Sequence, residues 1–262
     1  MQITNDDLND LQRAKHVLEN PSLAAKITSL FGSPIEKGFE LLPDKWTEVV
    51  SDATRRALET ALDLALLTLD KDGRGQAQNI WHKLAVAVSG GTGGALGIAG
   101  LIVELPVSAG IMLRSIADIA RAEGEQLNLP EVKLACIEVF ALGGRSSSDD
   151  ASESGYFAVR AALAKAVSEA AAFIAERGLA KEGAPAIARL ISQLAERFGV
   201  TVSEKAAAQA VPAIGAVGGA LINLVFIDHF QDMARGHFIV RRLERKYDAA
   251  TVKAAYVALP NK

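Results

Sequence analysis

The sequence contains a single cysteine, Cys136, so it can form no internal disulfide and has no CxxC metal or redox pair. It has only 8 prolines, and aromatic residues are only 5% of the chain although half of its residues are hydrophobic. Because Ala, Leu, Val and Ile supply most of the apolar content and proline is scarce, the composition favours helices. No alternating strand pattern and no Asn-Gly hairpin turn is present. We therefore predict an all-α fold, a single multi-helix bundle.

An excess of positive charge and an export signal are also missing. The formal net charge is −3, which predicts no general attraction to nucleic acid. The first residues, 1–17, contain Asp6, Asp7 and Asp10 and no apolar run, which is not the pattern of a signal peptide. We expect a cytoplasmic protein, or one that lies peripherally on the inner face of a membrane.

Two apolar segments are rich in glycine. The segment 84–113 has one charged residue, Glu104, and seven glycines; the segment 206–227 has no charge and three glycines. Glycine inside a helix costs about 1 kcal/mol relative to alanine, so this density needs a structural reason. The pairs that could let helix backbones approach closely are Gly90/Gly94, Gly93/Gly97 and Gly215/Gly219. We predict that the two segments pack against each other as a central Gly-rich apolar core.

An alternative for these segments is contact with a bilayer, since about 20 apolar residues span a hydrocarbon core. Pro106 and Glu104 argue against a permanent span, because a carboxylate near the middle of a membrane is costly. The stretch 89–94 lacks the GK[ST] ending of a phosphate-binding loop. We predict no nucleotide or other cofactor.

We expect one domain over residues 1–262, with an N-terminal helix in 1–26, a flexible polar loop at 145–155 and a C-terminal tail at 249–262. Asn5 is the expected first cap. Pro130 should begin a helix that ends at Leu142, before two glycines. Gly199 should end another helix. Thr201 and Glu204 then have the spacing of a capping box.

Charged residues at helical spacing follow each Gly-rich segment. We predict a polar network in which Arg114 or Arg121 lies near Asp228 or Asp232. The full set comprises Arg114, Asp118, Arg121, Asp228, Asp232 and Arg235.

An enzymatic interpretation uses some of the same groups. Glu104, Asp228, His229 and Asp232 are the candidate catalytic residues of a hydrolase, and as a cluster they could bind a divalent cation. No HExxH or GxSxG motif supports either role, so we predict no metal site and keep the hydrolase as an alternative. Cys136 lies in an apolar helix and is expected to be a buried structural thiol.

Four basic residues end the last long helix: Arg241, Arg242, Arg245 and Lys246. Cations at a helix C-terminus interact favourably with the helix dipole. The alternative role is binding of an anionic lipid head group or an acidic partner.

Three long stretches carry a family resemblance: GGALGIAGLIVELPVSAGIMLRSIADIARAEGEQL, PEVKLACIEVFALGG and VPAIGAVGGALINLVFIDHFQDMARGHFIVRRLERKY. Through these stretches the chain resembles the EcsC family of bacterial proteins over roughly residues 27–248. The resemblance implies an α-helical cytoplasmic protein, in a family named after a protein that is encoded beside an ABC transporter. It implies no catalytic residue.

The resulting expectation is a non-enzymatic, membrane-proximal helical protein that binds anionic lipid or a membrane protein such as an ABC transporter, with a link to transport or secretion. The hydrolase is one alternative. A soluble scaffold, in which glycines such as Gly94 and Gly219 serve packing alone, is the other. The sequence indicates no oligomeric state.

Overall fold

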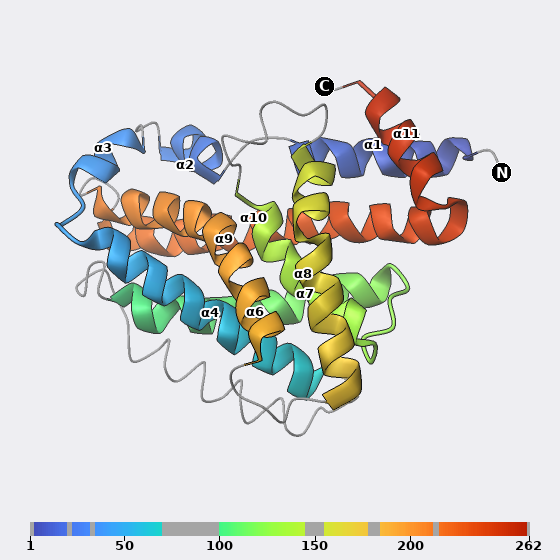
Figure 1. Cartoon of the computed structure of the whole chain (residues 1–262). Helices are drawn as coiled ribbons and strands as arrows, with labels where there is room; N and C mark the ends of the chain where they lie inside the picture. The colour runs from blue at the N-terminus through green and yellow to red at the C-terminus, as the bar shows by residue number, and fades with distance from the viewer. Residues whose placement is uncertain are drawn as a thin grey trace.

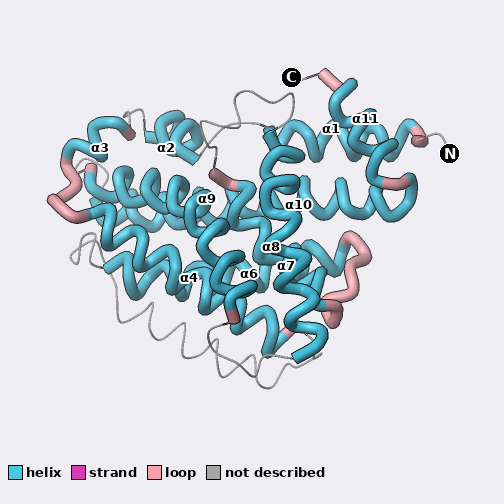
Figure 2. The backbone as a smooth tube through the Cα atoms, in the orientation of Figure 1, coloured by secondary structure: helices cyan, strands magenta, loops and turns pink. Residues whose placement is uncertain are grey.

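The all-α prediction is confirmed by the computed structural model, which describes residues 3–19, 23–31, 35–69, 100–144, 155–177, 184–211 and 215–260. Over these residues the chain forms ten helices and no strand (Figure 2). With the labels of Figure 1, the helices are α1 (Asn5–Glu19), α2 (Leu23–Phe31), α3 (Glu36–Glu40), α4 (Trp46–Thr68), α6 (Leu101–Ala122), α7 (Pro130–Leu142), α8 (Gly155–Arg177), α9 (Pro185–Ala210), α10 (Gly215–Tyr247) and α11 (Ala249–Ala258).

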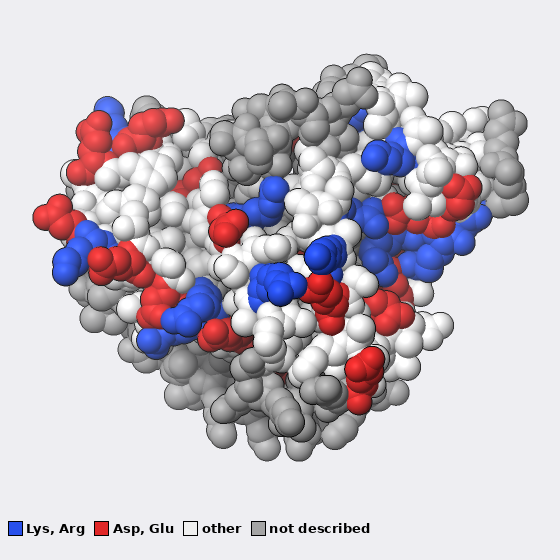
Figure 3. Space-filling model, in the orientation of Figure 1, with Lys and Arg blue, Asp and Glu red and all other residues white. Residues whose placement is uncertain are grey.

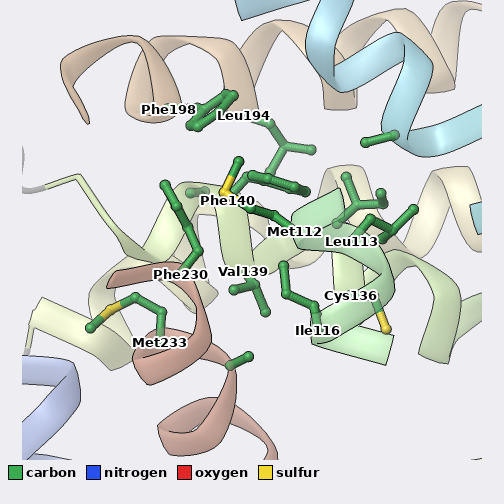
Figure 4. Close-up of a cluster of buried hydrophobic side chains, with 14 of the residues drawn as sticks. Met112, Leu113, Ile116, Cys136, Val139, Phe140, Leu194, Phe198, Phe230 and Met233 are labelled. Carbon is green, nitrogen blue, oxygen red and sulfur yellow. The ribbon is translucent and has the colours of Figure 1, made fainter. Parts of the chain in front are cut away.

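Helix α7 occupies the centre of the hydrophobic core. Every residue from Val132 to Ala141 is buried, and all of them are apolar except the charged Lys133 and Glu138. Its Phe140 ring lies 5.1 Å from the ring of Phe198 on α9 and 5.5 Å from that of Phe230 on α10. Met112 and Ile116 of α6 complete this cluster (Figure 4). The bounds predicted for this helix are also confirmed.

The two Gly-rich segments can be compared only in part. Residues 84–99 lie outside the described residues, so the predicted contact of the first segment with the second stays a prediction there. The helices that contain the later parts of the two segments, α6 (residues 101–113 of the first) and α10 (residues 215–227 of the second), do pack together. Gln231 Nε2 on α10 donates to Ser115 Oγ on α6 at 2.9 Å.

The described glycines that permit close helix packing are not those of the predicted pairs. A Cβ on Gly38 would lie 2.0 Å from the carbonyl oxygen of Ala207, so α3 and α9 touch through their backbones. A Cβ on Gly236 would lie 2.6 Å from Leu18 Cγ, where α1 crosses α10. A Cβ on Gly219 would meet no atom of the described residues within 4 Å, so the predicted tight packing at Gly219 is not found against the described helices. Gly94 lies outside the described residues.

Helix α9 does not end at Gly199, contrary to the prediction. Leu194, Phe198 and Val202 are fully buried and continue one apolar face across the glycine. Burial of these side chains outweighs the glycine penalty of about 1 kcal/mol. The capping box is therefore wrong as well: Thr201 is buried inside the helix, and Glu204 instead accepts a hydrogen bond from the backbone of α2.

Other predicted boundaries also change. Thr4, rather than Asn5, caps α1, because the backbone N–H of Asp7 donates to Thr4 Oγ1 at 3.3 Å. The region 1–26 holds α1 and the start of α2, and the expected tail forms α11. Of the polar loop, only Gly155 is described, and it begins α8. None of the helices in the described ranges combines the length and hydropathy that a membrane crossing requires.

Candidate functional site

A groove of about 520 Å³ lies between the short helix α2 and the first half of α10. In Figure 1, α2 lies over the C-terminal half of α9 and the N-terminal half of α10, and it packs against both. The groove, called the α2–α10 groove below, is lined by Ala25, Lys26, Ser29, Leu30, Val225, Asp228 and Asp232. Helix α2 is held there by Leu23 and Ile27, whose side chains are buried.

Large aliphatic side chains are exposed at this groove. Leu30 on α2 is 53% exposed and lines it directly. On α10, Leu221 is 40% exposed and Leu224 is 57% exposed. Leu221, Leu224, Val225 and Asp228 lie at positions i, i+3, i+4 and i+7, which places them on one face of the helix. This face of α10 is thus apolar from Leu221 to Val225 and acidic from Asp228 onward.

Two of the carboxylates in the groove differ in their pairing. Asp232 is engaged through both oxygens, since Lys26 Nζ lies 2.9 Å from Oδ2 and Arg235 Nη1 lies 2.9 Å from Oδ1. Asp228 is exposed and forms no salt bridge with any residue of the described ranges. Of the two carboxylates that line the groove, Asp228 is thus the one that forms no salt bridge with a described residue.

Glu204 lies beneath α2. Its Oε2 accepts a hydrogen bond from the backbone N–H of Ala24 at 3.2 Å, in the first turn of α2. Burial raises the pKa of Glu204 to about 7, although the bond from Ala24 acts in the opposite direction. This carboxyl therefore titrates near neutral pH at the contact that holds one wall of the groove.

The four candidate catalytic residues each have a different environment. Glu104 Oε1 lies 2.7 Å from the Nζ of Lys205, which is fully buried on α9. His229 Nε2 lies 2.9 Å from the carbonyl oxygen of Gly143, and burial lowers the pKa of this imidazole to about 4. Asp232 is paired with Lys26 as described above. The structure thus joins Glu104 and His229 to separate partners, on α9 and at the end of α7.

A metal centre receives no support either. Within the described ranges, no group of three or more His, Cys, Asp or Glu side chains is arranged to hold a metal ion. The divalent-cation cluster considered for Glu104, Asp228, His229 and Asp232 is therefore not formed. Sequence spacing could not settle this, because Glu104 is on a different helix from the other three.

The predicted network between α6 and α10 is also not formed. Arg114 Nε lies 3.7 Å from Asp118 Oδ1, and Arg121 Nη1 lies 2.8 Å from the same oxygen, so both arginines pair within α6. Asp232 pairs with α2 and with Arg235 instead. These charged residues of α6 face solvent, since the side chains of Asp118 and Arg121 are each about half exposed. The contact between the helices is made by neutral groups such as Ser115 and Gln231.

The sequence profile of the EcsC protein family matches residues 5–243 of the 262. The chain belongs to the EcsC protein family. No curated protein and no solved structure matches it.

The basic end of α10 in this EcsC protein is neutralised by carboxylates of the same chain. Arg241 Nε lies 2.8 Å from Glu125 Oε1, and Arg245 pairs with the same oxygen. Arg242 lies 2.6 Å from Asp10 and 3.0 Å from Glu123. Lys246 Nζ lies 2.7 Å from Asp7 Oδ2.

Figure 3 shows Lys and Arg side chains interleaved with Asp and Glu side chains on the side of the molecule where the N-terminus lies. The bonds that Lys246, Tyr247 and Thr4 give to Asp7 hold the pKa of that carboxyl well below its usual range. Such pairing joins α1 and the turn after α6 to α10. Each of these four cations thus has a carboxylate of the same chain beside it.

A buried polar cluster in the EcsC protein had no signal in the sequence. The Tyr156 hydroxyl lies 3.1 Å from His237 Nδ1 and 3.3 Å from Arg160 Nη1. Arg160 also binds both carboxylate oxygens of Glu244, at 2.8 and 3.0 Å. Burial, with Arg160 and Arg241 nearby, holds the pKa of His237 well below its usual value. The cluster joins α8 to α10 and has the character of a structural network.

Cys136 has the predicted environment. It is fully buried in α7, and burial raises the pKa of its thiol to about 12. A thiol that stays protonated at neutral pH is a poor nucleophile, so Cys136 contributes packing volume rather than reactivity.

Proposed function

We propose that this EcsC protein is a non-enzymatic binding protein that works beside a membrane and holds a membrane-protein partner at its α2–α10 groove. The observation that carries the proposal is a set of exposed leucines. Leu30 lines the groove, and Leu221 and Leu224 lie beside it on the face of α10 that carries Val225 and Asp228. Large aliphatic side chains that gather at one exposed place are typical of interaction sites.

Binding is favoured over catalysis by the state of the titratable groups. Glu104 neutralises a buried lysine, His229 is hydrogen-bonded to the end of α7, and Asp232 carries two salt bridges. A hydrolase would need a base and an acid that converge on one substrate atom within hydrogen-bonding reach. These groups act instead as connections between helices, which argues against the hydrolase alternative.

A protein partner is favoured over lipid by the charges. Arg241, Arg242, Arg245 and Lys246 are all paired with carboxylates, so they offer little to an anionic head group. At the groove itself the charge that forms no salt bridge with a described residue is the negative Asp228, which would repel lipid phosphate. The family is named after a protein that is encoded beside an ABC transporter. This association also favours a membrane protein as the partner.

The proposal can be tested by site-specific photo-crosslinking in cells of the source organism. A benzophenone side chain at position 224, beside the groove, should give a cross-link to an integral membrane protein. The matched control is position 257, since Val257 is also exposed but lies on α11. Leu224→Asp, combined with a cross-linker at position 221, should remove the product without lowering the melting temperature.

The remaining outcomes decide against the proposal. A product of equal yield from positions 224 and 257, or none from position 224, would reject docking at the groove and favour the scaffold alternative. The purified protein can also be tested for flotation with vesicles that contain phosphatidylglycerol. If it floats and Leu224→Asp abolishes the flotation, the surface is a lipid site and the protein-partner proposal is overturned.

A further inference from the structure

The two walls of the α2–α10 groove have different chemistry, which restricts what can occupy it. Leu30 lines the groove from α2 and Val225 lines it from α10, and the exposed Leu221 and Leu224 continue this apolar surface as a strip beside the groove on the same face of α10. Asp228 follows one turn after Val225 on the same face. An occupant must therefore bring apolar groups and, next to them, a positive charge.

The helical spacing of the strip suggests the form of that occupant. Apolar side chains at i, i+3 and i+4, followed by a charge at i+7, match the repeat of another helix laid along α10. Binding of an amphipathic helix in an apolar groove is a recurrent mode of protein recognition. A volume of about 520 Å³ is in the range of binding pockets, and this groove is open to solvent, so a partner helix can enter from the side.

The charge at the end of the strip supplies complementarity. The Lys26 amine and the Arg235 guanidinium are both engaged by Asp232, at 2.9 Å each. Neither pairs with Asp228, and no other cation in the described ranges forms a salt bridge with it. An incoming arginine or lysine would gain a carboxylate, and an incoming acidic group would be repelled, so this position selects by charge.

We propose that the α2–α10 groove binds an amphipathic helix of the partner, with leucine-like anchors against Leu30, Leu221 and Leu224 and a basic residue against Asp228. The inference rests on the proposed function and specifies the partner segment. A lipid chain would fill the apolar strip but would leave Asp228 beside its phosphate, which the charge disfavours.

The test uses the full chain and two synthetic peptide probes, followed by fluorescence polarisation. Each peptide has 18 residues, with leucines at i, i+3, i+4 and i+7 on one helical face. One carries arginine at both ends of that face, so that either orientation can reach Asp228, and the other carries glutamate at the same places. The arginine peptide should bind at least tenfold more tightly than the glutamate peptide.

Three variants identify the site. Asp228→Lys should reverse the charge preference, and Leu224→Asp should abolish binding of both peptides. Glu59→Lys makes the same charge change on an exposed position of α4 and should alter neither affinity. Circular dichroism of each variant checks that the helices are retained.

The opposite results overturn the inference in distinguishable ways. Equal affinity for both peptides, or no effect of Asp228→Lys, rejects the charge selection. If neither peptide binds while the cross-link from position 224 still forms, the helix inference fails and the proposed function stands. A third outcome is that neither the peptide complex nor the cross-link forms and the purified chain self-associates in a manner that Leu224→Asp abolishes. A second copy of the chain then fills the groove, and both the helix inference and the proposed function are wrong.

Discussion

The amine of Lys205 lies 2.7 Å from Glu104 Oε1 and 4.6 Å from the centre of the Phe226 ring, with the lysine side chain fully buried. This pair joins α9 to the first turn of α6 across the core. Burial lowers the pKa of Lys205 from its usual value, and Glu104 opposes that change. The charge on Lys205 thus depends on one carboxylate, whose own side chain is 29% exposed.

Removal of that carboxylate should therefore be more damaging than removal of the lysine. Glu104→Ala leaves a buried amine without its counter-ion, and we expect the free energy of unfolding in urea to fall by about 1–3 kcal/mol. Lys205→Met should cost less, because the glutamate left behind reaches water. When Lys205→Met is already present, Glu104→Ala should no longer lower the free energy of unfolding. An equal loss from Glu104→Ala in the wild-type and Lys205→Met backgrounds would show that the pair does not act as a unit.

Close packing of α3 on α9 makes a second prediction. Gly38→Ala would place a methyl group 2.0 Å from the carbonyl oxygen of Ala207, so the backbones must separate. Overpacking of this kind should cost about 1–3 kcal/mol in urea denaturation. The control is Gly219→Ala, where no atom of the described residues lies within 4 Å and alanine should be neutral or stabilising by up to about 1 kcal/mol. A larger loss of stability from Gly219→Ala than from Gly38→Ala would contradict this packing.

Glu204 should make stability depend on pH. Its pKa is raised from 4.5 to about 7 in the folded chain, so folding favours the protonated form. The contribution of Glu204 to the free energy of unfolding is fully present below about pH 4.5 and is lost as the pH rises through 7. We expect a loss on the order of 3 kcal/mol between these limits.

Glu204→Gln provides the control for this pH effect, because it keeps an oxygen to accept from Ala24 but cannot ionise. The difference between wild type and Glu204→Gln, measured by urea denaturation from pH 5 to 8, isolates this group from others nearby, such as Lys26, Asp228, Asp232 and His229. Parallel curves for the two proteins would refute the assignment.

The carboxylate that binds the basic end of α10 should be structurally important. Glu125, with a side chain only 3% exposed, accepts from both Arg241 and Arg245. Glu125→Gln should lower the free energy of unfolding by about 1–3 kcal/mol, because two cations lose their shared partner in a partly buried place.

Asp118→Asn is the matched control for Glu125→Gln. Asp118 also pairs with two arginines, but its side chain is 54% exposed, so the expected change is below about 0.5 kcal/mol. A similar loss from both variants would mean that burial does not distinguish the two sites.

Local signals predicted some elements well. Pro130 at the first turn and two glycines after Leu142 mark both ends of α7, and the structure has these bounds. The same kind of rule failed at Gly199, because tertiary burial of Phe198 and Val202 on one face keeps α9 continuous. It failed again at Gly219, because the spacing of glycines does not show which helix lies opposite.

The site was less accessible to sequence reasoning. Arg241, Arg242, Arg245 and Lys246 were recognised as a basic helix end, but their partners Asp7, Asp10, Glu123 and Glu125 lie more than a hundred residues away in the chain. The groove likewise depends on α2 and α10, which composition cannot bring together. Exposure of Leu30 and Leu224 is a property of this arrangement and not of their local sequence.

The sequence by itself determined the helical class and both ends of α7, because propensity and capping act over a few neighbouring residues. Only the tertiary structure decided which charges are paired, which glycines touch another backbone and which leucines remain in solvent. These depend on distances between segments remote in the chain, and short-range patterns carry no information about such distances.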